Sequence, residues 1–330
     1  MRDRSIGSAR WPGALLLLAA VFLLGGCATM PPLSEATRAS VPQSVALDDV
    51  PFRGQRQYQC GPATLAMMLD HAGRRVAVDE LIPQVFLPGR EGSVQPEMLA
   101  AVRRHGLIPF VIPGSMDALL QETAAGHPVA VLQNLSLPWW PAWHYAVVVG
   151  YDLEREALVL HSGETPFREV APGRFDATWA RSDRWAFVAL PPGELPASSV
   201  GRPEVQTVAA FEEVQGGKAA LPAWRALAGR RPDLAMAQFG LGNALAGEGD
   251  RHGAAVAFRR AADAQPSLAA AWLNLGLVLR SLGETAEAAE AFERAAGIPG
   301  PLRDRAQSLL EAGLSPAAPV GGNGNRGRSP

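Results

Sequence analysis

The C-terminal third of the sequence repeats with a period of 34 residues. Residues 235–268 align with residues 269–302 without a gap, and the matching positions are small or apolar. The matched pairs are Leu241 and Leu275, Gly242 and Gly276, Leu245 and Leu279, Gly249 and Gly283, Ala254 and Ala288, Phe258 and Phe292, and Ala261 and Ala295. A unit of this length buries its apolar face by stacking on neighbouring copies. The period therefore predicts an array of stacked repeats.

The period and the residue pattern together resemble the tetratricopeptide repeat, a helix–turn–helix unit. Trp272 and Pro266 stand where that repeat has tryptophan and proline, whereas Gln238 and Gly300 depart from it. A weaker earlier copy is suggested by Ala220, Trp224, Leu227 and Pro232. The resemblance implies about three repeats over residues 205–313, which would bind a protein partner on a concave face or only pack on the neighbouring domain. Ordinary alanine-rich helical hairpins are the alternative.

The N-terminal residues follow the sequence pattern of a secretory signal peptide, in which basic residues precede an apolar run. Arg2, Arg4 and Arg10 precede an apolar run over residues 14–24 that is too short to span a membrane. The run ends in a Leu-Gly-Gly-Cys sequence at Cys27, which resembles the bacterial lipobox. In a lipobox, signal peptidase cuts just before the cysteine, whose thiol carries lipid.

The lipobox resemblance implies a signal peptide over residues 1–26 and a membrane anchor through lipid on Cys27. Ala28 after the cysteine resembles the signal for the outer membrane, with the protein facing the periplasm of the bacterial cell envelope. The alternative is an ordinary signal peptide. Export places the chain in an oxidising compartment, and a lipidated Cys27 leaves Cys60, the other of two cysteines, without a disulfide partner.

Composition divides the rest of the chain. A length of 330 residues favours two domains, and 48% hydrophobic residues are enough for sizeable cores. The expected segments are a tether over residues 27–49, a globular domain over 50–192, a linker over 193–204, the repeats, and a disordered tail over 314–330. The net charge is −2 and basic residues form no stripe, so nucleic acid is not expected as a partner.

Within residues 50–192 the expected helices precede most of the expected strands, which predicts an α+β fold with helices packed on an antiparallel sheet. Helical spacing or a helix start predicts helices over residues 61–71, 78–82, 95–105 and 116–123. Nearly continuous apolar runs predict strands over residues 107–112, 129–132, 145–149, 158–160 and 185–190.

Cys60 stands at the start of the first of these helices, because Pro62 suits a first helical turn. The unpaired N–H groups and the positive end of the helix dipole favour the thiolate, which is the nucleophilic form of cysteine. A free cysteine is otherwise commonly a small buried hydrophobe. Since an exported chain would keep this thiol unpaired, we interpret Cys60 as a nucleophile.

A thiolate nucleophile needs a base, which is usually a histidine distant in the sequence. His144 differs from the other five histidines because it opens an apolar strand, where a charged or hydrated group is costly without a partner. We therefore predict that His144 pairs with Cys60.

A family resemblance rests on these residues. Gln55, four intervening residues and the sequence Cys60-Gly61-Pro62-Ala63, followed by the run from His144 to Asp152, resemble the C39-like cysteine peptidases. The likeness covers about residues 50–192 and implies a papain-like fold that hydrolyses peptide bonds without a cofactor or a metal. Cys60 would be the nucleophile, His144 the general base and acid, and Gln55 an oxyanion donor beside the Cys60 N–H. Gln57 and Gln59 are rivals of Gln55.

The third member of the site departs from that family, which has Asp-Pro after the strand that follows the histidine. Strand alternation from Leu158 and Leu160 places Ser162 at the aspartate position and Gly163 at the proline position. Ser162 would accept the Nδ1–H of His144 and stabilise the imidazolium less than a carboxylate does. His161 is the neighbouring alternative, although the alternation points it away.

Three tryptophans, Trp139, Trp140 and Trp143, crowd the segment before His144. They could form or gate a wall of the cleft, pack in a core with Pro138 and Pro141, or contact a bilayer.

These observations predict a lipid-anchored cysteine peptidase of the cell envelope, with a peptide or protein substrate and repeats that bind a protein partner. Two alternatives remain at this point: a papain-like acyltransferase, and a non-catalytic envelope scaffold that presents its repeats.

Overall fold

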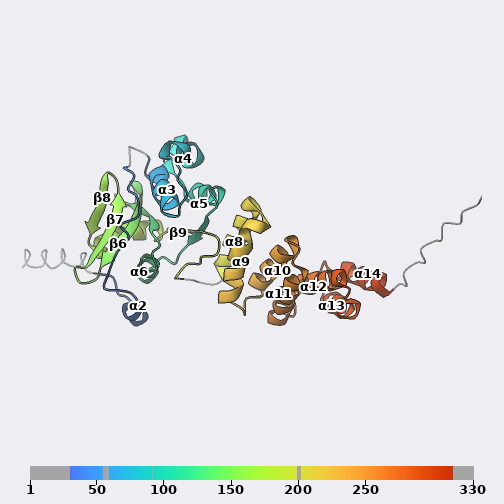
Figure 1. The fold of residues 1–330 in the computed structure, drawn as a ribbon. Coiled ribbons are helices and arrows are strands. Elements are labelled where there is room, and N and C mark those ends of the chain that lie inside the picture. Colours follow the sequence, from blue (N-terminus) through green and yellow to red (C-terminus); the bar gives the residue numbers. More distant parts are fainter. Residues whose placement is uncertain (1–29, 55–58, 91, 199–201, 315–330) are drawn as a thin grey trace, which may run out of the picture. The chain divides into compact units, whose positions relative to one another are not determined.

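The computed structural model describes residues 30–54, 59–90, 92–198 and 202–314 (Figure 1). The predicted signal peptide, Cys27, Gln55, Gln57 and the predicted tail from 315 onward lie outside the described residues. The chain divides into two compact units, Met1–Gln215 and Gly216–Pro330. None of the helices within the described residues has the length and apolar character needed to cross a membrane.

The first unit is built on a seven-stranded sheet in which six strands follow the order β4-β9-β5-β6-β7-β8 and β1 pairs with β6. Every one of these pairings is antiparallel. The strands are β1 (Ser44–Ala46), β4 (Ile108–Val111), β5 (Val129–Asn134), β6 (Trp143–Asp152), β7 (Ala157–Ser162), β8 (Thr165–Val170) and β9 (Ala186–Leu190). All residues of β5 and β9 are buried, as expected for strands covered on both faces.

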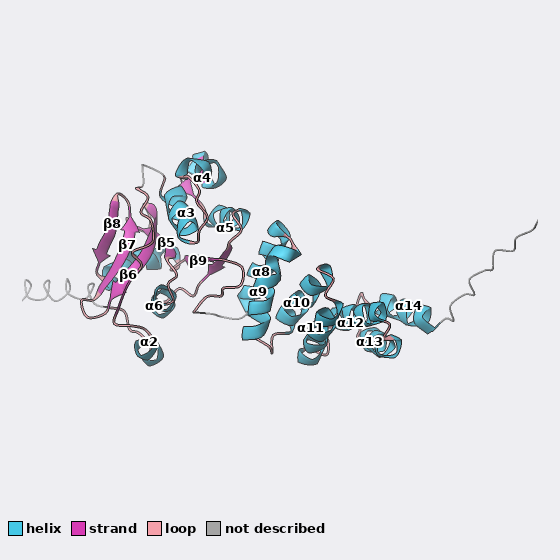
Figure 2. Cartoon of the chain, in the orientation of Figure 1, coloured by secondary structure: helices cyan, strands magenta, loops and turns pink. Residues whose placement is uncertain are grey.

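Helices pack on this sheet, which confirms the α+β fold (Figure 2). They are α2 (Glu35–Ser40), α3 (Cys60–His71), α4 (Val78–Val85), α5 (Gln95–Arg104), α6 (Met116–Ala124), α7 (Pro172–Trp179) and α8 (Arg202–Gln215). A short pair of strands, β2 (Phe86–Leu87) and β3 (Gly92–Ser93), and two 3-10 turns, η1 (Pro88–Arg90) and η2 (Ala180–Ser182), complete the unit.

The core of this unit lies between α3 and the sheet. Leu65, Met68 and Leu69 of α3 are fully buried in one cluster with Tyr145 and Val147 of β6. The same cluster takes in α4 and α5, so the helix that begins at Cys60 is fixed on several sides. α8 packs on β4 and α5, and Gln215 donates from Nε2 to the carbonyl of Arg103 at 2.8 Å.

Two parts of the chain are more structured than their composition predicts. Residues 35–40 and 44–46, inside the predicted tether, form α2 and the edge strand β1, whose Ser44 pairs with Asp152. The strand β8 was not predicted, because five of its six residues are exposed. An exposed edge strand does not need alternating apolar and polar residues.

The second unit is all-helical and contains the tetratricopeptide repeats. Its helices are α9 (Gly217–Arg230), α10 (Ala235–Gly247), α11 (Arg251–Ala264), α12 (Ala269–Leu282), α13 (Thr285–Gly297) and α14 (Arg303–Leu314). The two aligned 34-residue copies are the pairs α10–α11 and α12–α13. In each pair a glycine of the first helix faces a phenylalanine of the second: a Cβ at Gly242 would lie 2.6 Å from Phe258, and one at Gly276 would lie 2.5 Å from Phe292.

Candidate active site

Cys60 is the first residue of α3, as the sequence predicts. The preceding residue, Gln59, provides no side-chain cap, and the first intrahelical bond joins the Ala63 N–H to the Gln59 carbonyl at 3.0 Å. Pro62 has no N–H to leave unpaired in this turn. The thiol is free and partly buried. The side chain of the nucleophile candidate thus lies at an uncapped helix start.

His144 is the second residue of β6, and Ser162 is the last residue of β7. The two strands are antiparallel neighbours, with Val147 opposite His161 and Val148 opposite Leu160. This pairing places His144 and Ser162 on the same face of the sheet. The His144 Nε2 and the Ser162 Oγ lie 2.9 Å apart.

The ring nitrogen in this contact differs from the expected one. The sequence reasoning assigned Nδ1 to Ser162, whereas the structure places Nε2 there. That assignment was therefore wrong, because strand alternation fixes the face of a side chain but not the rotation of its ring. Nδ1 is left as the ring nitrogen that does not contact Ser162.

Cys60 and His144 line one open cleft of about 920 Å³. Its other lining residues come from β3 and the segments around it, from the end of β5 and the start of β6, from the turn after β7, and from the turn after α7. They are Arg90, Gly92, Ser93, Val94, Gln95, Leu132, Pro141, Ala142, Trp143, Tyr145, Gly163, Arg181, Ser182 and Asp183. The fold therefore brings the predicted nucleophile and the predicted base, 84 residues apart in the sequence, into one cavity.

Burial dominates the electrostatics of both groups. It raises the pKa of the Cys60 thiol, although the backbone N–H groups of Tyr145, Gly61 and Cys60 itself act in the opposite direction. Burial, together with the smaller effect of the positive charge of Arg168 on β8, lowers the pKa of His144 to about 4. The N–H groups at the helix start thus favour the thiolate, as the sequence predicts, but burial outweighs them and the net shift favours the neutral thiol. Both groups are neutral at pH 7.

His161, the alternative to Ser162, has a structural role. It is fully buried, and its Nε2 donates to the Val50 carbonyl at 3.0 Å while its Nδ1 accepts from the Phe167 N–H at 3.2 Å. Its ring also makes edge contacts with Phe52 and Phe167. With both ring nitrogens engaged on the face away from Ser162, His161 cannot orient His144.

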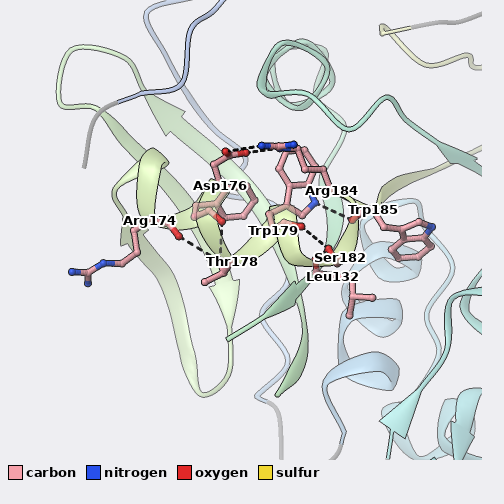
Figure 3. A network of polar contacts seen from close by, with 9 residues as sticks. Leu132, Arg174, Asp176, Thr178, Trp179, Ser182, Arg184 and Trp185 are labelled. Carbon is pink, nitrogen blue, oxygen red and sulfur yellow. Dashed lines mark hydrogen bonds and ion pairs between the residues drawn. The ribbon is translucent and has the colours of Figure 1, made fainter. Parts of the chain in front are cut away.

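One wall of the cleft, formed by Arg181, Ser182 and Asp183, has no signal in the sequence. Figure 3 shows how the turn that carries it is held: Arg184 makes a double ion pair with Asp176 at 2.7 and 3.0 Å, and the Ser182 hydroxyl donates to the Leu132 carbonyl. The Trp179 indole N–H also donates to the Trp185 carbonyl at 3.0 Å. These contacts join α7 and the turn after it to β5. The wall therefore depends on contacts between segments distant in the sequence, which the spacing of residues along the chain does not predict.

The three tryptophans at and just before the start of β6 do not pack in a core. Trp139 is 77% exposed, Trp140 76% and Trp143 54%. The alternative that they pack inward with Pro138 and Pro141 was therefore wrong. Of the three, Trp143 lines the cleft.

Comparisons with known proteins agree with this architecture. Residues 47–180 match the model of the Peptidase_C39 like family, and residues 269–299 match that of the tetratricopeptide repeat. The N-terminal domain is C39-like. The matched range spans the positions of Cys60, His144 and Ser162, and the C39-like and tetratricopeptide resemblances predicted from the sequence are confirmed. No curated protein matches the chain.

Several solved structures resemble parts of the chain. A protein from Bacillus anthracis described as a C39-like peptidase is 17% identical over 45% of this chain and 98% of its own, with a TM-score of 0.38. The peptidase domain of Streptococcus ComA, a bi-functional ABC transporter involved in quorum sensing, is 18% identical over 43% of this chain and 98% of its own, with a TM-score of 0.36. MamA is 23% identical over 34% of this chain and 75% of its own, with a TM-score of 0.29.

Proposed function

We propose that the C39-like domain hydrolyses peptide bonds by a Cys–His mechanism. The observation that carries this proposal is that Cys60 and His144 line the same cleft, with the His144 ring held at Nε2 by Ser162. A cysteine, a histidine and a third group that orients the ring are the components of nucleophilic acyl transfer.

In the proposed reaction, Nδ1 of His144 takes the thiol proton as Sγ of Cys60 forms a bond to the substrate carbonyl carbon. The Cys60 N–H and the Gln55 amide would hold the negative charge that develops on the carbonyl oxygen. The C–N bond then breaks, and the His144 proton passes to the leaving amine. Water, deprotonated by His144, attacks the thioester and releases the acid and the thiol. Because both groups start neutral, the proton moves during attack and not before it.

The test is cleavage of a peptide library by the purified full chain, followed by mass spectrometry of the products. We expect Cys60→Ser and His144→Ala each to lower kcat/KM by about 10³-fold or more. His252→Gln, in the second unit, is the matched control and should leave cleavage unchanged. If the wild type and both variants release products at the same rate, the cleft is not catalytic and the chain is an envelope scaffold.

The same library separates hydrolysis from acyl transfer. An added amine competes with water for the thioester, so a transferase would form amide products in preference to acids. We expect acids to dominate even with excess amine. Dominant amide products would instead assign the domain to the acyltransferase alternative.

The proposed setting of this activity is the bacterial cell envelope, with lipid on Cys27 anchoring the chain at the outer membrane on its periplasmic side. The lipobox-like sequence supports this anchor. The tetratricopeptide repeats would bind a protein partner, as arrays of this kind do. Cys27→Ser should prevent lipidation and release the chain from the membrane fraction. Unchanged membrane association of Cys27→Ser would contradict the anchor.

A further inference from the structure

The segment that runs from the end of β5 to the first residue of β6 exposes an unusual amount of apolar surface. Besides Trp139, Trp140 and Trp143, it exposes Leu135 at 52% and Leu137 at 48%. From Leu135 to Trp143 it contains no charged residue. We call these nine residues the tryptophan loop. Contiguous exposed apolar surface of this kind marks a site of interaction, whereas single exposed hydrophobic residues are common.

The tryptophan loop is held in a fixed conformation. Asn134, which is 1% exposed, accepts at Oδ1 from the N–H groups of Ser136 at 3.0 Å and Ala142 at 2.9 Å. Its Nδ2 donates to the Leu137 carbonyl at 3.3 Å. Arg181 donates from Nη1 to the carbonyls of Asn134 at 3.1 Å and Ser136 at 2.5 Å. The exposure of the tryptophans is therefore built into the loop and needs no rearrangement.

The two most exposed tryptophans do not face the cleft. The loop residues that line the cleft are Pro141, Ala142 and Trp143, whereas Trp139 and Trp140 are not among the lining residues. A substrate in the cleft would therefore leave the tip of the loop uncovered. Any surface that covers Trp139 and Trp140 therefore lies outside the cleft.

The chain itself indicates which surface lies nearby. Leu33, six residues after Cys27, is already 9% exposed, and the Ser34 N–H donates to Asp117 at 3.0 Å. Six residues span at most about 20 Å when fully extended. This step rests on the proposed lipid anchor: lipid on Cys27 would hold the first unit within that distance of a bilayer. Tryptophan is the side chain most typical of the interface between lipid and water, because its ring is apolar and its N–H is polar.

We propose that the tryptophan loop inserts Trp139 and Trp140 into the interfacial region of a phospholipid bilayer. Because Pro141, Ala142 and Trp143 of the same loop line the cleft, the mouth of the cleft would then lie beside the membrane surface. The substrates reached most easily would be polypeptides held at that surface. The loop lacks cations, so this contact would depend on apolar burial and not on anionic lipids.

The test uses tryptophan fluorescence of the full chain with phosphatidylcholine vesicles, half of them prepared with brominated acyl chains that quench on contact. Trp139→Phe/Trp140→Phe removes the two reporters and keeps an apolar loop. Trp185→Phe/Trp272→Phe is the matched control, since it removes the same number of tryptophans from outside the loop. We expect brominated lipid to quench the wild type and the control, and the loop variant to lose most of this quenching.

The outcomes separate this proposal from the lipid anchor and from the peptidase activity. A lipid on Cys27 alone brings the chain to the vesicle without placing Trp139 or Trp140 among acyl chains, so equal quenching of the two variants would overturn the proposal. An intact mass of the N-terminal peptide reports lipidation separately. A second outcome would also contradict the proposal. In it, vesicles leave the fluorescence unchanged, whereas apolar peptides added to Cys60→Ala shift the fluorescence only when Trp139 and Trp140 are present. The loop would then bind substrate, and the membrane proposal would be wrong.

Discussion

Cys60 and His144 are both uncharged at neutral pH, and this state has a measurable consequence. Because the pKa of His144 is lowered to about 4, its imidazole is available as a base at all higher pH values. We expect the acid limb of kcat/KM to lie near pH 4 and not near 6.5. The pKa of Cys60 is raised, so alkylation of the free protein by iodoacetamide should keep increasing above pH 9. An alkylation plateau below pH 7 that His144→Ala abolishes would instead reveal a preformed ion pair.

Ser162 occupies the position at which a carboxylate would stabilise the His144 imidazolium. Replacing it by aspartate should raise the pKa of His144 and move the acid limb of kcat/KM upward by about 1–2 pH units. Ser162→Ala is the matched variant: it loses the 2.9 Å contact to Nε2, so kcat should fall about tenfold while the acid limb stays near pH 4. An acid limb that does not move in Ser162→Asp would show that this position does not orient the imidazole.

The candidate residues were predictable from the sequence because each is a residue type that is uncommon in its sequence context. Cys60 is an unpaired thiol at a helix start, and His144 is a polar residue that opens an apolar strand. Strand alternation was sufficient to choose Ser162 over His161. The ring rotation of His144 and the direction of both pKa shifts could not be predicted, because they depend on how far the fold buries the two side chains and on the charge of Arg168.

The end of α6 is joined to the segment after β9 by one buried carboxylate. Glu122 is fully buried and accepts from His127 Nδ1 at 2.7 Å, from the Ala197 N–H at 3.1 Å, and from the Ser198 N–H at 2.8 Å. Burial acts to raise the pKa of Glu122, but these hydrogen bonds together lower it. The stability it contributes is therefore present above the unfolded pKa and is lost as pH falls through the folded value.

Glu122→Gln should lower the free energy of unfolding at pH 7 by about 1–3 kcal/mol, because it keeps the shape and removes the charge that its donors face. Glu169→Gln is the control: its ion pair with Arg155 is half exposed and should contribute less than about 1 kcal/mol. Urea unfolding at pH 7 and pH 3 measures both variants. The difference between Glu122→Gln and the wild type should shrink at pH 3, and a constant difference would contradict the linkage.

In the repeats, the packing of two helices depends on glycines that lie under aromatic rings. Gly242→Ala would place a methyl group 2.6 Å from the Phe258 ring, so we expect a loss of about 1–3 kcal/mol from overpacking. Gly247→Ala lies in the same helix with nothing within 4 Å and should be neutral or stabilising by up to about 1 kcal/mol. Thermal unfolding compares the two variants. A similar destabilisation in both would attribute the effect to the helix backbone and not to Phe258.

The sequence predicted well those elements whose own residues form a clear pattern, either a repeat or a continuous apolar run. The 34-residue period predicted the pairs α10–α11 and α12–α13, and continuous apolar runs predicted the buried strands β5, β6 and β9. Among the elements that were not predicted are α2, β1, β8 and α7. The residues of the first three are largely exposed, and their conformation depends on partners such as Asp117 and the edges of β6 and β7. The helix α7 buries Phe175 and Trp179 but is only eight residues long.

At the scale of the whole molecule, the division into two compact units implies that each has its own unfolding transition. Each unit has a separate core: α3 packs on the sheet in the first, and Phe258 and Phe292 pack with their neighbouring helices in the second. Domains with separate cores unfold as separate cooperative units. Single substitutions should therefore act on one transition only.

Glu122→Gln and Gly276→Ala test this independence, because they lie in different units. We expect calorimetry to show that Glu122→Gln lowers the first unit's transition alone, and that Gly276→Ala, whose methyl would lie 2.5 Å from Phe292, lowers the second unit's alone. Cys60 alkylation during heating identifies the first transition. In the double variant both shifts should add within about 0.5 kcal/mol, as expected for distant sites. If either substitution moves both transitions equally, the units unfold together, and damage to the repeats would also open the cleft that Cys60 and His144 line.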